Sequence, residues 1–133
     1  MKYVLDASVA VAAFRPNEPL HAVCVKRLTP LLKGHDSIVV PVIFRIEVSS
    51  ALARSGFTAA QVERFAGSLL SYATEVAIGP IRAQRIQRVA VAARLRAADA
   101  IYVWVAHQKG LPLVTADEEI RQRASALCHL VVP

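Results

Sequence analysis

Apolar residues along the chain fall into short blocks that are separated by polar residues, glycines and prolines. Several blocks are continuous rather than alternating, a pattern typical of strands that are buried on both faces of a parallel sheet. We expect strands at residues 3–6 (YVLD), 37–41 (SIVVP), 74–78 (TEVAI), 111–115 (LPLVT) and 129–133 (HLVVP).

The segments between these strands carry helix start and stop signals. Asn17 is expected to cap a helix from Glu18 to about Lys33, and Pro41 to open a helix that Gly56 closes. Thr58 and Gln61 have the spacing of a capping box. Other helices are expected to begin near Ser8, at Pro80, near Asp99 (ending at Gly110) and at Asp117.

Alternating strands and helices predict one α/β domain over residues 1–133, with a central parallel sheet and helices on both of its faces.

Composition narrows the class of protein. With 133 residues and 55% hydrophobic residues, the chain is long enough for one sizeable core. Its apolar runs are shorter than the ~20 residues of a membrane span, and Asp6 interrupts the N-terminal run that would resemble a signal peptide, so we expect a cytoplasmic protein without membrane contact. Cys24 and Cys128 are expected to be buried free thiols rather than a disulfide framework. The formal net charge of +6 favours a polyanionic partner, nucleic acid before an anionic membrane.

Four acidic residues occupy unusual places. Asp6 and Asp117 follow predicted strands, Glu47 interrupts the apolar face of its helix, and Asp99 begins a helix that is apolar on nearly every side. Taken singly, each is explained as a helix cap or an ion-pair partner, Asp99 with Arg94 or Arg96.

Taken together, these acids predict a metal site. Strand ends and helix starts meet at the carboxyl edge of a parallel sheet, where ligands bind. Clustered carboxylates repel one another, and oxygen-only clusters bind hard cations such as Mg²⁺ or Mn²⁺. Such a site is suited to phosphodiester hydrolysis.

Two other folds also gather acids at strand ends. A phosphoacceptor receiver domain needs a paired early acid and a late lysine, and neither "VLDAS" nor "LPLVT" supplies them. A haloacid-dehalogenase phosphatase needs DxDxT, where this chain has Ser8 in place of the second aspartate. The glycines form neither the GxGxxG motif nor a P-loop, so no Gly-rich phosphate-binding loop offers a competing mechanism.

The segments "YVLDASV", "RIEVSSAL", "RAADAIYVWVA" and "LVTADEEI" resemble, in order, the four acidic motifs of PIN-domain ribonucleases. The resemblance covers essentially the whole chain. In its small size and single-domain layout, the chain is most similar to VapC-type toxins of type II toxin–antitoxin systems. It implies a metal-dependent endoribonuclease that hydrolyses RNA, with Mg²⁺ or Mn²⁺ as cofactor. It also implies a homodimer and a small cognate antitoxin protein as partners.

The same resemblance implies roles for individual residues. Asp6, Glu47, Asp99 and Asp117 would be the catalytic metal ligands, Glu47 and Asp117 partly through water. Ser8 and Thr115 match supporting hydroxyl positions.

Several basic and aromatic residues also occupy notable positions in the sequence. We expect Arg94 and Arg96 to contact RNA phosphates at the rim of the cleft, with Arg15 as a weaker candidate. Arg82, Arg85 and Arg88 fit a solvated helix face, and Tyr102 and Trp104 fit core or dimer packing.

Two alternative functions stay open: an RNA-processing PIN nuclease without a toxin role, and a non-catalytic nucleic-acid-binding module on the same fold.

Overall fold

A five-stranded, entirely parallel sheet organises the molecule. The computed structural model describes residues 1–133, and its strands lie in the order β3-β2-β1-β4-β5. The strands are β1 (Lys2–Leu5), β2 (Ser37–Pro41), β3 (Ala73–Val76), β4 (Leu113–Val114) and β5 (Leu130–Val131). β4 and β5 are shorter than the sequence predicted, but all five expected strands are present.

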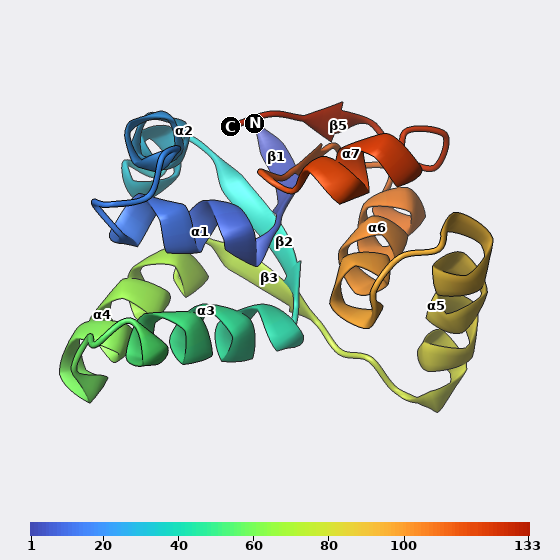
Figure 1. Ribbon diagram of the computed structural model, residues 1–133, viewed down its shortest axis with the longest axis horizontal. Helices are drawn as coiled ribbons and strands as arrows, with labels where there is room; N and C mark the ends of the chain where they lie inside the picture. The colour runs from blue at the N-terminus through green and yellow to red at the C-terminus, as the bar shows by residue number, and fades with distance from the viewer.

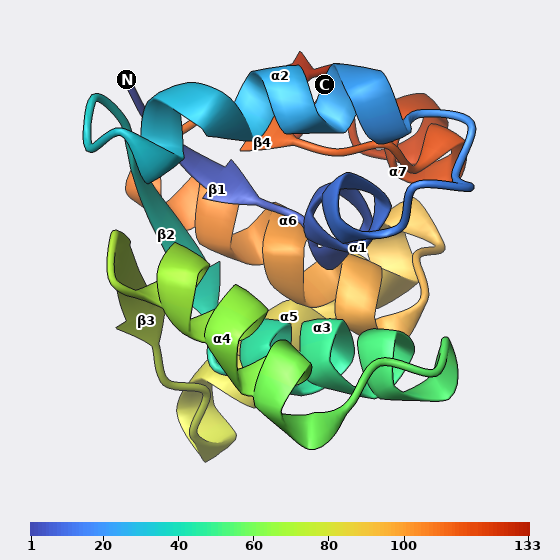
Figure 2. The same cartoon turned by 90° about the vertical axis from the view of Figure 1, so that its left-hand side faces the viewer.

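Seven helices cover the two faces of this sheet. They are α1 (Ala7–Phe14), α2 (His21–Leu32), α3 (Ile43–Arg54), α4 (Ala59–Leu70), α5 (Pro80–Ala93), α6 (Ala97–Lys109) and α7 (Glu118–Arg123). Helices α1 to α4 lie on one side of the sheet, and α5 and α6 lie on the other (Figure 1). Turned by 90°, the first layer has α2 along the top, α3 and α4 along the bottom and α1 between them, with α6 behind (Figure 2). The predicted α/β architecture with helices on both faces is confirmed.

The core joins both layers through the central strand and α6. Tyr3, Val4 and Leu5 of β1 have no exposed surface. In α6, every residue from Tyr102 to Ala106 is buried. This helix is therefore enclosed on nearly all sides, as its composition predicted, and its first turn is held in a fixed place at the carboxyl edge of the sheet.

The predicted start of the second helix is wrong. α2 begins at His21 rather than Glu18, and Leu20 instead of Asn17 occupies the N-cap position, without a side-chain cap. Pro19 gives the reason, because its ring disfavours the helical conformation of the residue before it. Glu18 instead pairs with Arg15 at 2.8 Å.

The predicted role of Pro41 is also wrong. Pro41 ends β2 opposite Val76, and α3 begins two residues later at Ile43. The pairing of β1 with β2 stops at Val39, so the N–H that Pro41 lacks is not needed for that ladder. The next residue continues the pairing with β3, since Val42 N–H donates to the Val76 carbonyl at 3.0 Å.

Three other boundary signals are confirmed. Thr58 and Gln61 form both hydrogen bonds of a capping box on α4, and Pro80 occupies the first turn of α5. Gly110 ends α6 in the left-handed region at φ 62°. None of the helices is both long enough and apolar enough to cross a membrane.

Two glycine-to-alanine substitutions are expected to change stability in opposite directions. At Gly110 the positive φ strains any side chain, so Gly110→Ala should lower the free energy of unfolding by about 1 kcal/mol. Gly67 lies inside α4, and a Cβ there would meet no atom within 4 Å, so Gly67→Ala should raise it by about 0.5–1 kcal/mol. Urea denaturation of the two variants measures both changes. Undiminished stability of Gly110→Ala would contradict the left-handed end assigned to α6, and a loss of stability in Gly67→Ala would contradict open space beside α4.

Candidate active site

A cleft of about 740 Å³ opens at the carboxyl edge of the sheet, and all four predicted acids line it. Its wall also includes Ser8 and Arg96. Glu18, which the sequence reasoning did not consider for the site, contributes a fifth carboxylate from the loop before α2. The cleft therefore collects acidic side chains from distant parts of the chain.

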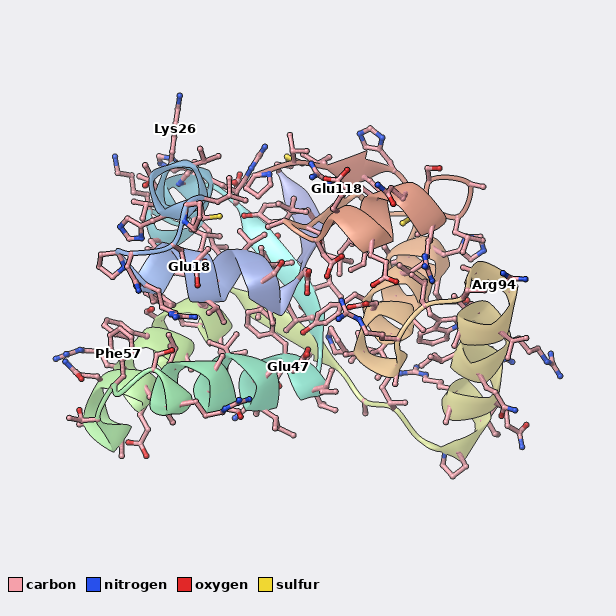
Figure 3. The ribbon with its side chains drawn as sticks, viewed as in Figure 1. Glu18, Lys26, Glu47, Phe57, Arg94 and Glu118 are labelled. Carbon is pink, nitrogen blue, oxygen red and sulfur yellow. The ribbon has the colours of Figure 1, made fainter.

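The topology explains why these residues meet. Leu5 and Val114 are register partners in the parallel pair β1–β4, so Asp6 and Asp117 leave neighbouring strands at the same edge. Asp99 lies in the first turn of α6. Glu47 lies in the second turn of α3, near the middle of the molecule in Figure 3.

Asp6 is the most buried acid of the cleft, with 5% of its surface exposed. Its Oδ2 accepts hydrogen bonds from Ser8 Oγ and Thr115 Oγ1, both at 2.7 Å. Burial raises the pKa of Asp6, and the two hydroxyls only partly offset this increase. Ser8 and Thr115, the two hydroxyl residues that the motif resemblance singled out, thus both contact the first acid.

The same hydroxyls bind the following backbone. Thr115 Oγ1 accepts from Asp117 N–H at 3.0 Å, and Ser8 Oγ accepts from Ala116 N–H at 3.3 Å. The chain segments after β1 and β4 are therefore joined through side chains on both sides of Asp6. This network holds the first and fourth acids at a defined separation.

Glu47 is held by a residue that the sequence reasoning assigned only to packing. Tyr102 donates its hydroxyl hydrogen to Glu47 Oε1 at 2.6 Å. Burial raises the pKa of Glu47, and Asp6 and Asp99 add to the shift by repulsion. Tyr102 is three residues after Asp99, so both lie on one side of α6, and this spacing could have indicated its place in the site.

Arg96 is the counter-cation of the cleft. Its Nε donates to Asp99 Oδ2 at 3.1 Å, and its Nη2 donates to Asp117 Oδ2 at 3.0 Å. Glu119 Oε2 lies 3.5 Å from the same Nη2. Burial nevertheless raises the pKa of Asp99, because the guanidinium only partly compensates for it. The alternative explanation of Asp99 as an ion-pair partner of Arg96 thus describes a real contact.

Asp117 combines a structural and a site position. Its Oδ1 accepts from the backbone N–H groups of Glu119 and Ile120, which caps α7, while its Oδ2 faces Arg96. A carboxylate has two oxygens, so capping occupies one of them and leaves the other directed into the cleft. Asp6 occupies the N-cap position of α1 but makes no capping hydrogen bond, so capping does not explain that acid.

The other two predicted arginines lie outside the wall of the cleft. Arg15 pairs with Glu18 at its mouth. Arg94 is exposed at the left-handed end of α5, at the outer margin of the molecule in Figure 3. Of the three, Arg96 alone lines the cleft.

The chemistry of the donor set fits a hard divalent cation. The polar atoms facing one another are carboxylate and hydroxyl oxygens, which Mg²⁺ and Mn²⁺ prefer. In the conformation observed, no group of three acids closes around one point. Oxygens of Asp99 and Asp117 are engaged by Arg96 instead, so a cation and Arg96 would compete for them.

Several solved structures share the fold of this chain. No curated protein matches the sequence. The crystal structure of PAE2754 from Pyrobaculum aerophilum is 25% identical, with a TM-score of 0.71, over 98% of this chain and 83% of that one. VapBC2 from Rickettsia felis, bound to a DNA fragment from its promoter, is 15% identical with a TM-score of 0.73, over 99% and 98% of the two chains. FitAcB from Neisseria gonorrhoeae is 19% identical with a TM-score of 0.62, over 98% and 96%.

A family match accounts for nearly the entire chain. The PIN domain sequence pattern matches residues 3–126, which include all four acids of the cleft and every strand except β5, apart from the first residue of β1. The chain therefore belongs to the PIN domain family.

Proposed function

We propose that the protein is a metal-dependent endoribonuclease, the toxin of a toxin–antitoxin pair. PIN domains are generally nucleases, and the observation that carries the proposal is the gathering of Asp6, Glu47, Asp99 and Asp117 around one cleft. The net charge of +6 suits a polyanionic substrate.

The four acids would hold Mg²⁺ or Mn²⁺. A bound divalent cation supplies positive charge against the phosphodiester group and lowers the pKa of an attacking water. The chain's own residues prepare the site: Ser8 and Thr115 orient Asp6, and Tyr102 orients Glu47 through the bonds described above. These contacts fix the carboxylates before substrate arrives, which reduces the reorganisation needed for catalysis.

Arg96 would exchange partners during loading of the site. Its guanidinium now neutralises Asp99 and Asp117, and a divalent cation would take over those oxygens. The side chain is 68% exposed, so once released it can turn toward solvent. There it would contact a phosphate of the RNA, the role for which forked guanidinium groups are suited.

The proposed partners follow from the solved structures of similar fold. VapBC2 and FitAcB carry the names of toxin–antitoxin complexes, which supports a small antitoxin as the partner of this chain. We also propose that the chain forms a homodimer and acts in the cytoplasm. A nearby gene for a small antitoxin would favour the toxin over an RNA-processing PIN nuclease.

Removal of the metal or of one acid is expected to stop RNA cleavage. Purified protein free of antitoxin should cut structured RNA in Mg²⁺ or Mn²⁺ and stop in chelator. Asp99→Asn should reduce cleavage by more than about 100-fold, because a ligand is lost. Glu63→Gln removes an equal charge at an exposed position of α4 and is the matched control. Undiminished cleavage in chelator would overturn the metal mechanism, and absence of any cleavage would favour the non-catalytic module.

Asp99→Asn, which is expected to lower cleavage, should at the same time raise the stability of the metal-free protein. The raised pKa values of Asp6, Glu47 and Asp99 mean that the metal-free fold is favoured while they are protonated. In chelator the free energy of unfolding should therefore fall as pH rises from the ordinary carboxyl range through the raised values. Asp99→Asn should melt higher than the parent in chelator at neutral pH and show a weaker pH dependence.

Metal completes this test. Mn²⁺ at about 100 times its Kd should stabilise the parent by about 2.7 kcal/mol by mass action, and Asp99→Asn much less. The measurement is a set of melts of parent, Asp99→Asn and Glu63→Gln, each with chelator or Mn²⁺. If Asp99→Asn melted lower in chelator and kept the full Mn²⁺ shift, Asp99 would be a structural ion-pair partner and not a metal ligand.

Competition between Arg96 and the metal gives a separate prediction. Arg96→Gln should bind Mn²⁺ roughly two- to tenfold more tightly, since exposed ion pairs of this kind are worth little individually. It should also melt lower in chelator, because the acids lose their counter-cation. Calorimetric titration with Mn²⁺ measures the affinity, and Arg88→Gln, an exposed arginine outside the cleft, is the control. Weaker Mn²⁺ binding by Arg96→Gln would contradict the proposal that the metal ion replaces Arg96 at Asp99 and Asp117.

A further inference from the structure

A second, smaller pocket lies between α5 and α6. Its volume is about 160 Å³, and three of its lining side chains are cationic: Arg82 and Arg85 from α5, and Lys109 from α6. Val76 and Val105 form an apolar part of the wall, to which Trp104 also contributes its ring. None of its residues lines the acidic cleft.

The pocket faces away from the acids. Trp104 follows Asp99 by five residues of α6, so at 3.6 residues per turn the two side chains are rotated by about 140° from each other. Lys109 lies ten residues after Asp99, about 15 Å further along the helix axis. The pocket and the cleft are therefore on different sides of the same helix.

The positive charge in this pocket has no acidic compensation. No aspartate or glutamate lines it. The ion pairs of the chain engage Arg15, Arg45, Arg96, Arg121, Arg123 and the amino terminus, and none of the three pocket cations. Cations gathered in one place repel one another, so a bound anion would stabilise the arrangement.

The groups in the pocket are partly held in position. The Arg82 guanidinium carbon lies 6.0 Å from the centroid of the Trp104 ring, and its Nη1 donates to the Ala77 carbonyl at 2.7 Å. Trp104 is 6% exposed and therefore forms a fixed wall. Arg85 and Lys109 are exposed and have no such anchor, so their donors are available to a ligand.

The size of the pocket limits the ligand. Sites for drug-sized molecules and cofactors usually have about 300–1,000 Å³, so this pocket admits only a small group. Arginine forks and a lysine ammonium match the oxygens of a phosphate, in geometry and in charge. We propose that Arg82, Arg85, Lys109 and Trp104 form a binding site for a single phosphate group, separate from the catalytic cleft.

The phosphate can come from inorganic phosphate or from the backbone of a bound RNA, and the test separates these sources. Trp104 is the only tryptophan of the chain, so its fluorescence and its single indole N–H resonance in NMR both report on this pocket. The probes are inorganic phosphate and a short single-stranded oligoribonucleotide, each titrated in chelator to prevent cleavage. Neither probe depends on the proposed metal chemistry.

The test variant is Arg85→Gln with Lys109→Gln. Its matched control is Arg88→Gln with Lys26→Gln, which removes the same charge from exposed positions outside the pocket; Lys26 extends into solvent from α2 in Figure 3. All four substituted side chains are exposed, and equal melting temperatures would verify that both doubles fold.

We expect a saturable change of the Trp104 signal in the parent and in the control. The pocket double should bind the effective probe roughly tenfold or more weakly, because two charge-assisted contacts are lost. A response to inorganic phosphate alone would identify a free anion as ligand, and a tighter response to the oligoribonucleotide would identify an RNA backbone phosphate. Equal weakening of both doubles, or no saturable change in either signal with either probe, would overturn the proposal.

Discussion

The burial of the Asp6 carboxylate is the constraint on which the carboxyl edge of the sheet depends. A charged group with 5% exposure is costly unless hydrogen bonds compensate for it. Ser8 from α1 and Thr115 from the end of β4 supply those bonds, and each hydroxyl also binds the backbone of the segment between β4 and α7. One side chain thereby extends, beyond the strand ends, the link between the first strand and the last third of the chain that the pairing of β1 with β4 provides.

Much of the fold could be predicted because the decisive signals are local. The capping box at Thr58 and Gln61, the proline at the start of α5 and the glycine after α6 each act within one helical turn, and each is found where expected. The two errors came from proline, where local rules conflict. Pro41 is compatible with a helix start and with a strand end, and only the point at which β1 stops pairing with β2 decides between them.

The gathering of the four acids at one edge was predictable, but the contacts that Glu47 and Asp117 make with distant segments were not. Four carboxylates in unusual places imply a cleft as soon as a parallel sheet is assumed, because strand ends share an edge. Contacts between distant segments carry no such local signal. The bond from Tyr102 to Glu47 joins α6 to α3, and the contact of Arg96 with Asp117 joins residues 21 positions apart. Whether a side chain at a rim turns inward depends on packing, which the sequence pattern does not contain.

The two hydroxyls on Asp6 Oδ2 also bear on how this sequence can change over evolutionary time. Because Ser8 and Thr115 donate to the same oxygen, either one can be lost while the carboxylate keeps a partner. Loss of both leaves a buried charge without a hydroxyl, so the two positions are expected to be non-additive rather than independent. Substitution at one position is therefore tolerated only while the other is retained, whichever of the two changes first.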